Sequence, residues 1–218
     1  MRLCRATWKK LVRAQQVNDS SDLHPADVAS ISDVIRRRRT IKPKQFTDRE
    51  IDDSVLNEIL QNANWAPTHG MTEPWRFSIY VGDARRRLAD FLAATYKEIT
   101  PSAEFKPNKY EGMSKNAMFA AVVIGIGMKR QESEKISELD EIQAVACAVQ
   151  NMHLTAAAYG LGAFWSTNVA AISDQMRDFA GLGKKDRALG LFYLGYPAGE
   201  WPSATREPME SKIRWHRQ

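Results

Sequence analysis

Hydrophobic and polar positions along this chain follow two different periods, and the longer period marks the helices. Apolar residues spaced three and four apart lie on one face of a helix. The first such stretch runs directly into four consecutive arginines, Arg36–Arg39, and the second follows a capping box, Thr47–Glu50. The spacing predicts helices over about 28–38, 51–63, 84–98, 138–159 and 173–179.

Short runs rich in valine, isoleucine and aromatic residues separate these helices and predict strands over 75–81, 120–128, 163–169 and 188–196. Helices and strands therefore interleave around few strands, which favours an α+β or mixed α/β class. The stretch Thr100–Lys115 is polar and contains prolines. We expect an excursion from the helices and strands there, which is a candidate for a lid.

The predicted helix over 138–159 differs from the others because its middle, Ala144–Val149, is small and apolar all round. A helix of this kind is buried on every side, and small residues allow a second helix to approach closely. In a chain of 218 residues, the core of a dimer is an attractive explanation.

Length and composition are those of a soluble globular protein with one domain, since 44% of the residues are hydrophobic and 26% are charged. The longest apolar run, Ala117–Met128, is too short to cross a bilayer. Cys4 and Cys147 form neither a disulfide framework nor a metal-binding or redox pattern. A reducing cytoplasm is therefore the expected location.

The net charge of +5 lies entirely in the N-terminal part of the chain. Residues 1–18 contain five basic residues and no acid, which leaves 26 basic against 26 acidic residues in the remainder. A nucleic-acid-binding protein usually carries its excess charge on the folded body, so the neutral body argues against that class. We expect residues 1–29 to form a flexible basic extension without a catalytic role, and residues 30–218 to form the functional domain.

Several kinds of catalytic and binding site have no matching motif. Cys147 and His153 are six residues apart on one predicted helix, which points their side chains in different directions. The four histidines lack metal-binding spacing, and neither a nucleophile elbow nor a phosphate-binding P-loop occurs. The glycine pairs at 125/127 and 160/162 lack the third glycine of a dinucleotide fingerprint.

The arginine block has two interpretations. Arg36–Arg39 can be a solvated helix end, where positive charge complements the helix dipole. The block can also bind a phosphate, because guanidinium groups match phosphate oxygens and Thr40 adds a hydroxyl donor. In an extended segment Lys42 points the same way as Thr40. These residues alone leave both interpretations open.

Longer motifs resemble the nitroreductase family. The stretch Ile35-x-x-Arg38-Arg39-Thr40-x-Lys42 is similar to the I-x-x-R-R-S-x-R/K motif that opens those proteins, and Ala66-Pro67-Thr68 followed by Pro74-Trp75 is similar to their A-P-S-x-x-N-x-Q-P-W loop. The long helix of small residues and three later segments recur in the same order: Gly160–Trp165, Leu194–Pro197 and Arg206-x-Pro208-x-Glu210. The resemblance covers about 30–215. The loop departs from the family at Met71 and Glu73, and it carries His69 as one subgroup does.

The resemblance implies an FMN site. In the family, the opening arginines and hydroxyl hold the flavin phosphate and ribityl chain, which here means Arg38, Arg39 and Thr40. Lys42 would lie near flavin N1 and O2, where a fixed cation stabilises the charge of the reduced ring. The other implied cofactor-binding residues flank the ring or complete the phosphate site: Trp65, His69, Trp165, Ser166, Thr167 and Arg206. For both tryptophans, packing in the core or at a dimer interface is the alternative.

The implied fold is α+β, with a mixed β-sheet surrounded by helices and a long buried helix at a homodimer interface. The implied reaction passes hydride from NADH or NADPH to flavin N5, and then reduces a small acceptor such as a nitroaromatic or a quinone. No catalytic side chain, metal, nucleic acid or membrane is expected. Two alternatives stay open: a dehalogenase or dehydrogenase of the same fold with a dedicated substrate, and a non-enzymatic nucleic-acid or partner-binding module that uses the arginine block.

Overall fold

The computed structural model describes residues 25–217, so most of the predicted basic extension lies outside the described residues. The chain divides into two units between Asp33 and Val34. Helix α2 (Pro25–Arg37) spans this division and confirms the helix predicted before the arginine block. The second unit carries the sheet and every predicted site residue.

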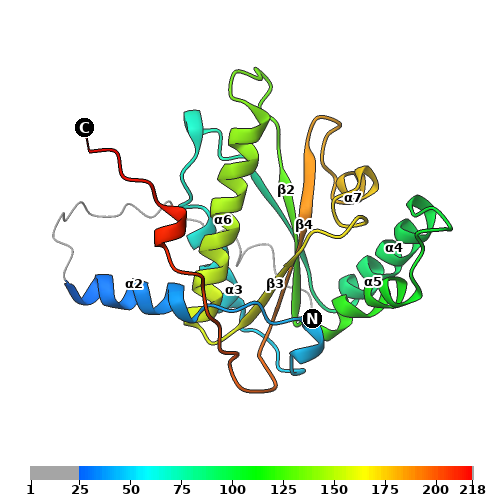
Figure 1. Cartoon of the computed structure of the whole chain (residues 1–218). Helices are drawn as coiled ribbons and strands as arrows, with labels where there is room; N and C mark the ends of the chain where they lie inside the picture. Colours follow the sequence, from blue (N-terminus) through cyan, green and yellow to red (C-terminus); the bar gives the residue numbers. More distant parts are fainter. Residues whose placement is uncertain (1–24, 218) are drawn as a thin grey trace. The chain divides into compact units, whose positions relative to one another are not determined.

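A four-stranded antiparallel sheet forms the centre of the second unit (Figure 1). Its strand order is β1 (Trp75–Tyr80), β2 (Val122–Met128), β4 (Arg187–Gly195) and β3 (Gly162–Ser166). The four predicted strands are thus confirmed. Parallel pairing among the described residues is limited to an isolated bridge between Thr40 and Ala163 at the β3 edge.

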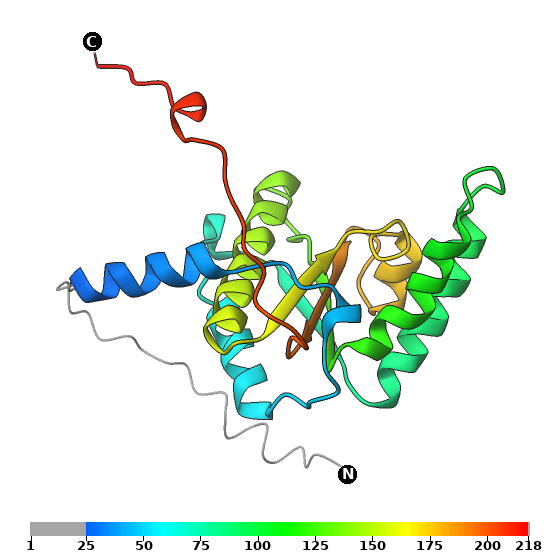
Figure 2. The same ribbon diagram turned by 60° about the horizontal axis from the view of Figure 1, so that its bottom comes forward.

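Helices cover both faces of the sheet (Figure 2). Alternate side chains of β2 and β4, such as Ile124 and Phe192, pack with α3 (Asp53–Ala63) and α6 (Glu138–Ala158). The intervening side chains, such as Val123 and Tyr193, pack with α4 (Asp83–Ile99), α5 (Pro107–Phe119) and α7 (Asp174–Phe179). Because successive side chains of a strand point to opposite faces, two hydrophobic layers form on one sheet. The α+β class is confirmed.

Three local predictions need correction. Thr47–Glu50 does not cap a helix: Thr47 N–H bonds Tyr196 O at 2.8 Å, and α3 begins at Asp53. The stretch Thr100–Lys115 is not irregular throughout, because α5 begins at Pro107, a residue well suited to a first helical turn. Within one chain α6 is not buried on every side, since Leu139, Gln143, Cys147 and Gln150 leave an exposed stripe. No helix in the described part is long and apolar enough to cross a membrane.

Candidate functional site

The end of the arginine block is fixed to the open edge of the sheet. Ile41 N–H donates to Ala163 O at 3.0 Å, next to the parallel bridge between Thr40 and Ala163. A few residues later, Phe46 pairs with Pro197 after β4. The segment 40–47 therefore runs along the end of the sheet, and it places Thr40 and Lys42 beside β3.

Two glycines allow this close approach. A Cβ atom added to Gly162 would lie 2.7 Å from the Ile41 side chain, and one added to Gly195 would lie 2.6 Å from the ring of Phe46. Both distances are shorter than the approach of a real Cβ atom to another side chain allows. Gly162 and Gly195 thus form the surface on which the segment 40–47 packs.

The C-terminal segment is bound to the same region by three hydrogen bonds. Ala198 N–H donates to Gln45 O at 2.8 Å, and the Trp201 indole N–H donates to Arg37 O. Arg39 Nε donates to Pro202 O at 2.8 Å. These bonds bring the chain after β4 back across the arginine block, and Arg206 follows four residues later.

Arg38 is the centre of a positively charged cluster. Its guanidinium is half-buried, and its pKa is lowered first by that burial and then by the positive charges of Arg206 and Arg39. No acid among residues 25–217 forms an ion pair with Arg38 or Arg206. Like charges held together without a counter-ion attract an anion, and phosphate matches the guanidinium fork.

The neighbouring guanidinium of Arg39 is used differently. Besides Pro202 O, it donates through Nη1 to Arg36 O at 2.6 Å and to Arg38 O at 2.8 Å. Three of its five N–H donors are therefore occupied by main-chain carbonyls. Arg39 holds the C-terminal segment in place, and mainly Nη2 is left for a ligand.

The predicted residues at the end of β3 and just after it have contacts of their own or face solvent. The Trp165 indole N–H donates to Leu189 O at 3.0 Å, and the ring is half-buried. Ser166 Oγ accepts from Asn168 Nδ2 at 3.1 Å, whereas Thr167 is exposed. The Trp165 ring therefore has a packing role in the sheet, and its N–H is not free for a ligand.

A pocket of about 450 Å³ lies between the 3₁₀ helix η1 (Pro43–Gln45) and α5. Lys42, Lys44 and Gln45 line it from one side. The rest of its lining comes from η1 (Pro43), α5 (Asn108, Gly112 and Asn116) and β3 (Phe164). Sequence analysis missed this site because α5 was not predicted. The four-residue spacing of 108, 112 and 116 was the available signal.

His69 lies in a different part of the same chain. His69 Nδ1 is 3.4 Å from Asp140 Oδ2, in the first turn of α6. Arg38 lies near enough to His153, toward the other end of α6, to lower its pKa. Thirteen residues of helix separate Asp140 from His153, about 20 Å at 1.5 Å per residue. Trp65 is exposed beyond the end of α3. One chain does not bring His69 to the Arg38 cluster.

The loop that departs from the family motif has a strained backbone. Met71 and Glu73 have positive backbone φ angles of 51° and 43°, which residues other than glycine rarely adopt. Thr68 Oγ1 stabilises this shape because it accepts from Glu73 N–H at 3.2 Å. Such strain is common at ligand-binding loops.

His153 was discarded with Cys147 in the sequence analysis, yet it borders the Arg38 cluster. The imidazole is buried against the ring of Phe192, and no described residue bonds its Nδ1. Burial first, and the charge of Arg38 second, lower the pKa of His153 from 6.5 to about 4. The side chain is therefore neutral at neutral pH.

This pKa gives a testable pH dependence. Between pH 6.5 and pH 4 the unfolded chain binds a proton at His153 that the folded chain does not, so stability falls as the pH falls. From pH 7 to pH 5 we expect this group to cost about 2 kcal/mol of unfolding free energy. Urea unfolding of wild type and His153→Gln at both pH values measures it. An equal loss of stability in both proteins would contradict the assignment.

The sequence of the chain is similar to that of proteins from one known family. The family model described as Nitroreductase family matches residues 35–196. The protein named Putative NAD(P)H nitroreductase YfhC, from Bacillus subtilis, is 29% identical over 187 residues, which is 84% of this chain and 92% of that protein.

Solved structures with the same fold include two related proteins. The Nitroreductase-like Family Protein from Bacillus cereus superimposes with a TM-score of 0.74 at 24% identity, over 93% of this chain and 99% of the other. A protein from Desulfovibrio desulfuricans, described as "a putative nitroreductase in complex with fmn", has a TM-score of 0.63 at 25% identity, with 90% and 99% coverage.

Proposed function

Because the chain belongs to the nitroreductase family, we propose that it is an FMN-dependent oxidoreductase that carries electrons from NADH or NADPH to a small acceptor such as a nitroaromatic or a quinone. The names of its relatives support both the nicotinamide donor and the flavin. FMN, when bound, would supply the redox chemistry between donor and acceptor. The residues of this chain bind and orient the reactants.

The observation that carries the proposal is the cluster of Arg38 and Arg206 beside Thr40. Two arginines without carboxylate partners in the described chain, one of them half-buried, meet at the edge of β3. Thr40 Oγ1 has no hydrogen-bond partner among the described residues either, and it is exposed. The donors therefore suit a phosphate group, which fits the phosphate of FMN.

The other residues have lesser or indirect roles in this proposal. Arg39 positions the C-terminal segment that carries Arg206. Ser166 and Thr167, at the end of β3 and just after it, would approach the flavin ring, and Trp165 would contribute a ring edge rather than a hydrogen bond.

A homodimer explains the separation of His69 from the Arg38 cluster. We propose that Trp65 and His69 serve the flavin held by the other subunit. The exposed stripe of α6, which includes Leu139 and Cys147, would then be covered by the second copy. Such a dimer has two identical sites, each built from both chains.

Initial-rate kinetics test the reaction. Because donor and acceptor use the same bound flavin in turn, double-reciprocal plots at several acceptor concentrations should give parallel lines. Intersecting lines would instead show that both reactants are bound together, and would contradict the shared site.

Lys42 gives a sharper test of the flavin's orientation. A cation next to N1 stabilises the reduced ring, so Lys42→Ala should lower the two-electron potential by about 30 mV, which corresponds to about 1.4 kcal/mol. Spectroscopic titration against a reference dye measures this potential. Lys109→Ala is the control, because Lys109 is an exposed lysine of α5 outside the pocket lining. An unchanged potential in Lys42→Ala would remove its role at N1.

A further inference from the structure

We infer that the pocket between η1 and α5 binds an anionic group, a carboxylate, of an aromatic acceptor. The inference rests on the proposed function, and it narrows the acceptor to nitroaromatics or quinones that carry an acid group. It assigns a role to Lys44, Asn108, Gly112 and Asn116, which the phosphate site does not use.

The charge of the pocket lining is positive. Lys42 and Lys44 are its charged members, and no acid lines it. Neither lysine forms an ion pair within the described chain. Glu111 of α5 is the neighbouring acid, but it is bound by Lys115 at 2.5 Å. That ion pair first, and the charge of Lys44 to a smaller extent, lower the pKa of Glu111. Lys44 therefore lies near α5 with its charge available to a ligand.

Side-chain amides add neutral donors to this charge. Asn108 and Asn116 lie on one face of α5, and neither amide has a hydrogen-bond partner among residues 25–217. Gln45 Oε1 accepts from Lys42 N–H at 3.1 Å, which leaves the amide N–H₂ of Gln45 for other contacts. A carboxylate has two oxygens that accept several hydrogen bonds, and it matches a site built of ammonium and amide donors.

Space and an aromatic wall favour a ring. Gly112 lies between the two asparagines, and a Cβ atom added there would approach only Asn116 Nδ2, at 3.6 Å. Phe164 also lines the pocket, and its ring stacks on Tyr193 with 6.0 Å between ring centroids. A volume of about 450 Å³ is in the range of small-ligand pockets. A single aromatic ring with one acid group suits these walls.

The composition of the lining favours a carboxylate over a phosphate of the nicotinamide donor. The pocket lining contains lysines but no arginine. The guanidinium fork of arginine matches the geometry of a phosphate, and the candidate phosphate site of this chain is built from arginines. Lys42 belongs to both the pocket and the proposed flavin site. An acceptor whose acid group is held by Lys44 would therefore have its ring beside the flavin.

The test compares two acceptors of nearly the same shape, the anion 4-nitrobenzoate and the neutral amide 4-nitrobenzamide. Lys44→Met should raise KM for 4-nitrobenzoate about tenfold, the usual effect of losing a charged hydrogen bond. KM for the amide should change less than about twofold. Lys109→Met, the matched control on the exposed side of α5, should leave both values unchanged.

A second variant tests the space instead of the charge. Gly112→Leu suits a helix better than glycine does, and its side chain fills the pocket. We expect it to raise KM for both acceptors while the protein keeps its flavin. Calorimetric titration of the oxidised holoprotein with 4-nitrobenzoate, without donor, measures binding in all variants independently of turnover.

Three results would overturn the inference. One is an equal rise of KM for both acceptors in Lys44→Met. Another is the same calorimetric affinity for 4-nitrobenzoate in wild type and Lys44→Met. The third is a higher KM for NADPH alone, which would give the pocket to the donor's phosphate. Failure of the proposed function would look different, because wild-type protein would then turn over neither acceptor. The calorimetric comparison of wild type with Lys44→Met would still decide whether the pocket binds the carboxylate.

Discussion

Arg38→Ala should weaken FMN binding about 10-fold to 100-fold, since it removes charged hydrogen bonds worth about 1.5–3 kcal/mol. Arg38 is half-buried whereas Arg206 is exposed, so Arg38 loses more water on folding and is the stronger anchor for a phosphate. Fluorescence titration of FMN against apoprotein measures the change. Arg206→Ala should act in the same direction, with a smaller effect.

Arg36→Ala is the matched control for Arg38→Ala. Arg36 belongs to the same arginine run, but its exposed side chain is absent from the interactions of the cluster. Arg38→Ala should not destabilise the apoprotein, because it relieves repulsion from Arg206 and Arg39. Equal FMN affinity in Arg36→Ala and Arg38→Ala, or a large loss of apoprotein stability in Arg38→Ala, would contradict the phosphate assignment.

Glu141→Ala should lower the free energy of unfolding by about 3–5 kcal/mol, because it leaves a buried arginine without its partner. Glu141 of α6 bonds Arg130, and their side chains are 0% and 11% exposed. Glu141 also accepts from Gln131 N–H at 3.2 Å. Arg130 N–H in turn donates to Asp186 at 2.8 Å. The pair thus joins the segment after β2 to α6 and to the start of β4. Urea denaturation measures the loss.

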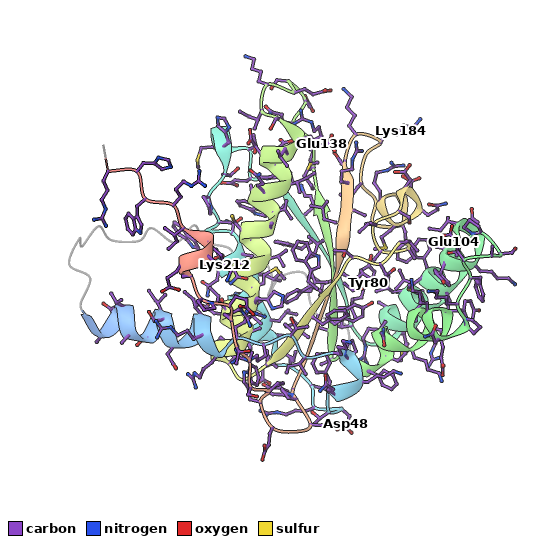
Figure 3. The ribbon with its side chains drawn as sticks, in the orientation of Figure 1. Asp48, Tyr80, Glu104, Glu138, Lys184 and Lys212 are labelled. Atoms are coloured by element: carbon purple, nitrogen blue, oxygen red, sulfur yellow. The ribbon has the colours of Figure 1, made fainter. Side chains whose placement is uncertain are left out.

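Glu138→Ala is the control, one turn earlier on the same helix (Figure 3). Glu138 pairs with Arg187 at 2.7 Å, but these side chains are 39% and 44% exposed. A pair so exposed contributes about 1 kcal/mol or less. The double variant Arg130→Met/Glu141→Leu should regain most of the stability, because it removes both buried charges. Similar losses in Glu138→Ala and Glu141→Ala would show that burial does not set the cost.

The strands were predictable because their signal is local. Valine and isoleucine in β2, and leucine, phenylalanine and tyrosine in β4, fill both faces of a buried sheet, and they stand out between polar turns. Helix α5 was not predictable in the same way. Met113 and Ala117 are its buried residues, and α4 supplies much of the apolar surface between the two helices. The helical period of its apolar residues is therefore too weak to recognise in the sequence.

The other incorrect predictions, at Thr47 and Cys147, arose because tertiary contacts set the local structure. Thr47 resembles a helix cap, but the pairing of its N–H with Tyr196 O holds it in an extended segment instead. The charge of Arg49 lies 3.8 Å from the centre of the Tyr196 ring and strengthens that arrangement. Cys147, on the exposed stripe of α6, is small and apolar, and therefore looks like a core residue in the sequence.

The site residues divide along the same lines. The motif around Arg38 could be found because its residues are consecutive, and Arg206 could be assigned only through the family resemblance. Their meeting depends on Trp201 and Pro202, which bind the arginine block from far along the chain. Neither the position of His153 beside Arg38 nor the separation of His69 from Arg38 has a sequence signal.

The absorbance spectrum of the purified protein tests the central claim most directly. We expect a flavin spectrum, FMN released on denaturation at about one per chain, bleaching of the bound flavin by NADH or NADPH without oxygen, and recovery of the spectrum when a nitroaromatic or a quinone is added. A colourless protein that does not take up added FMN would contradict the account.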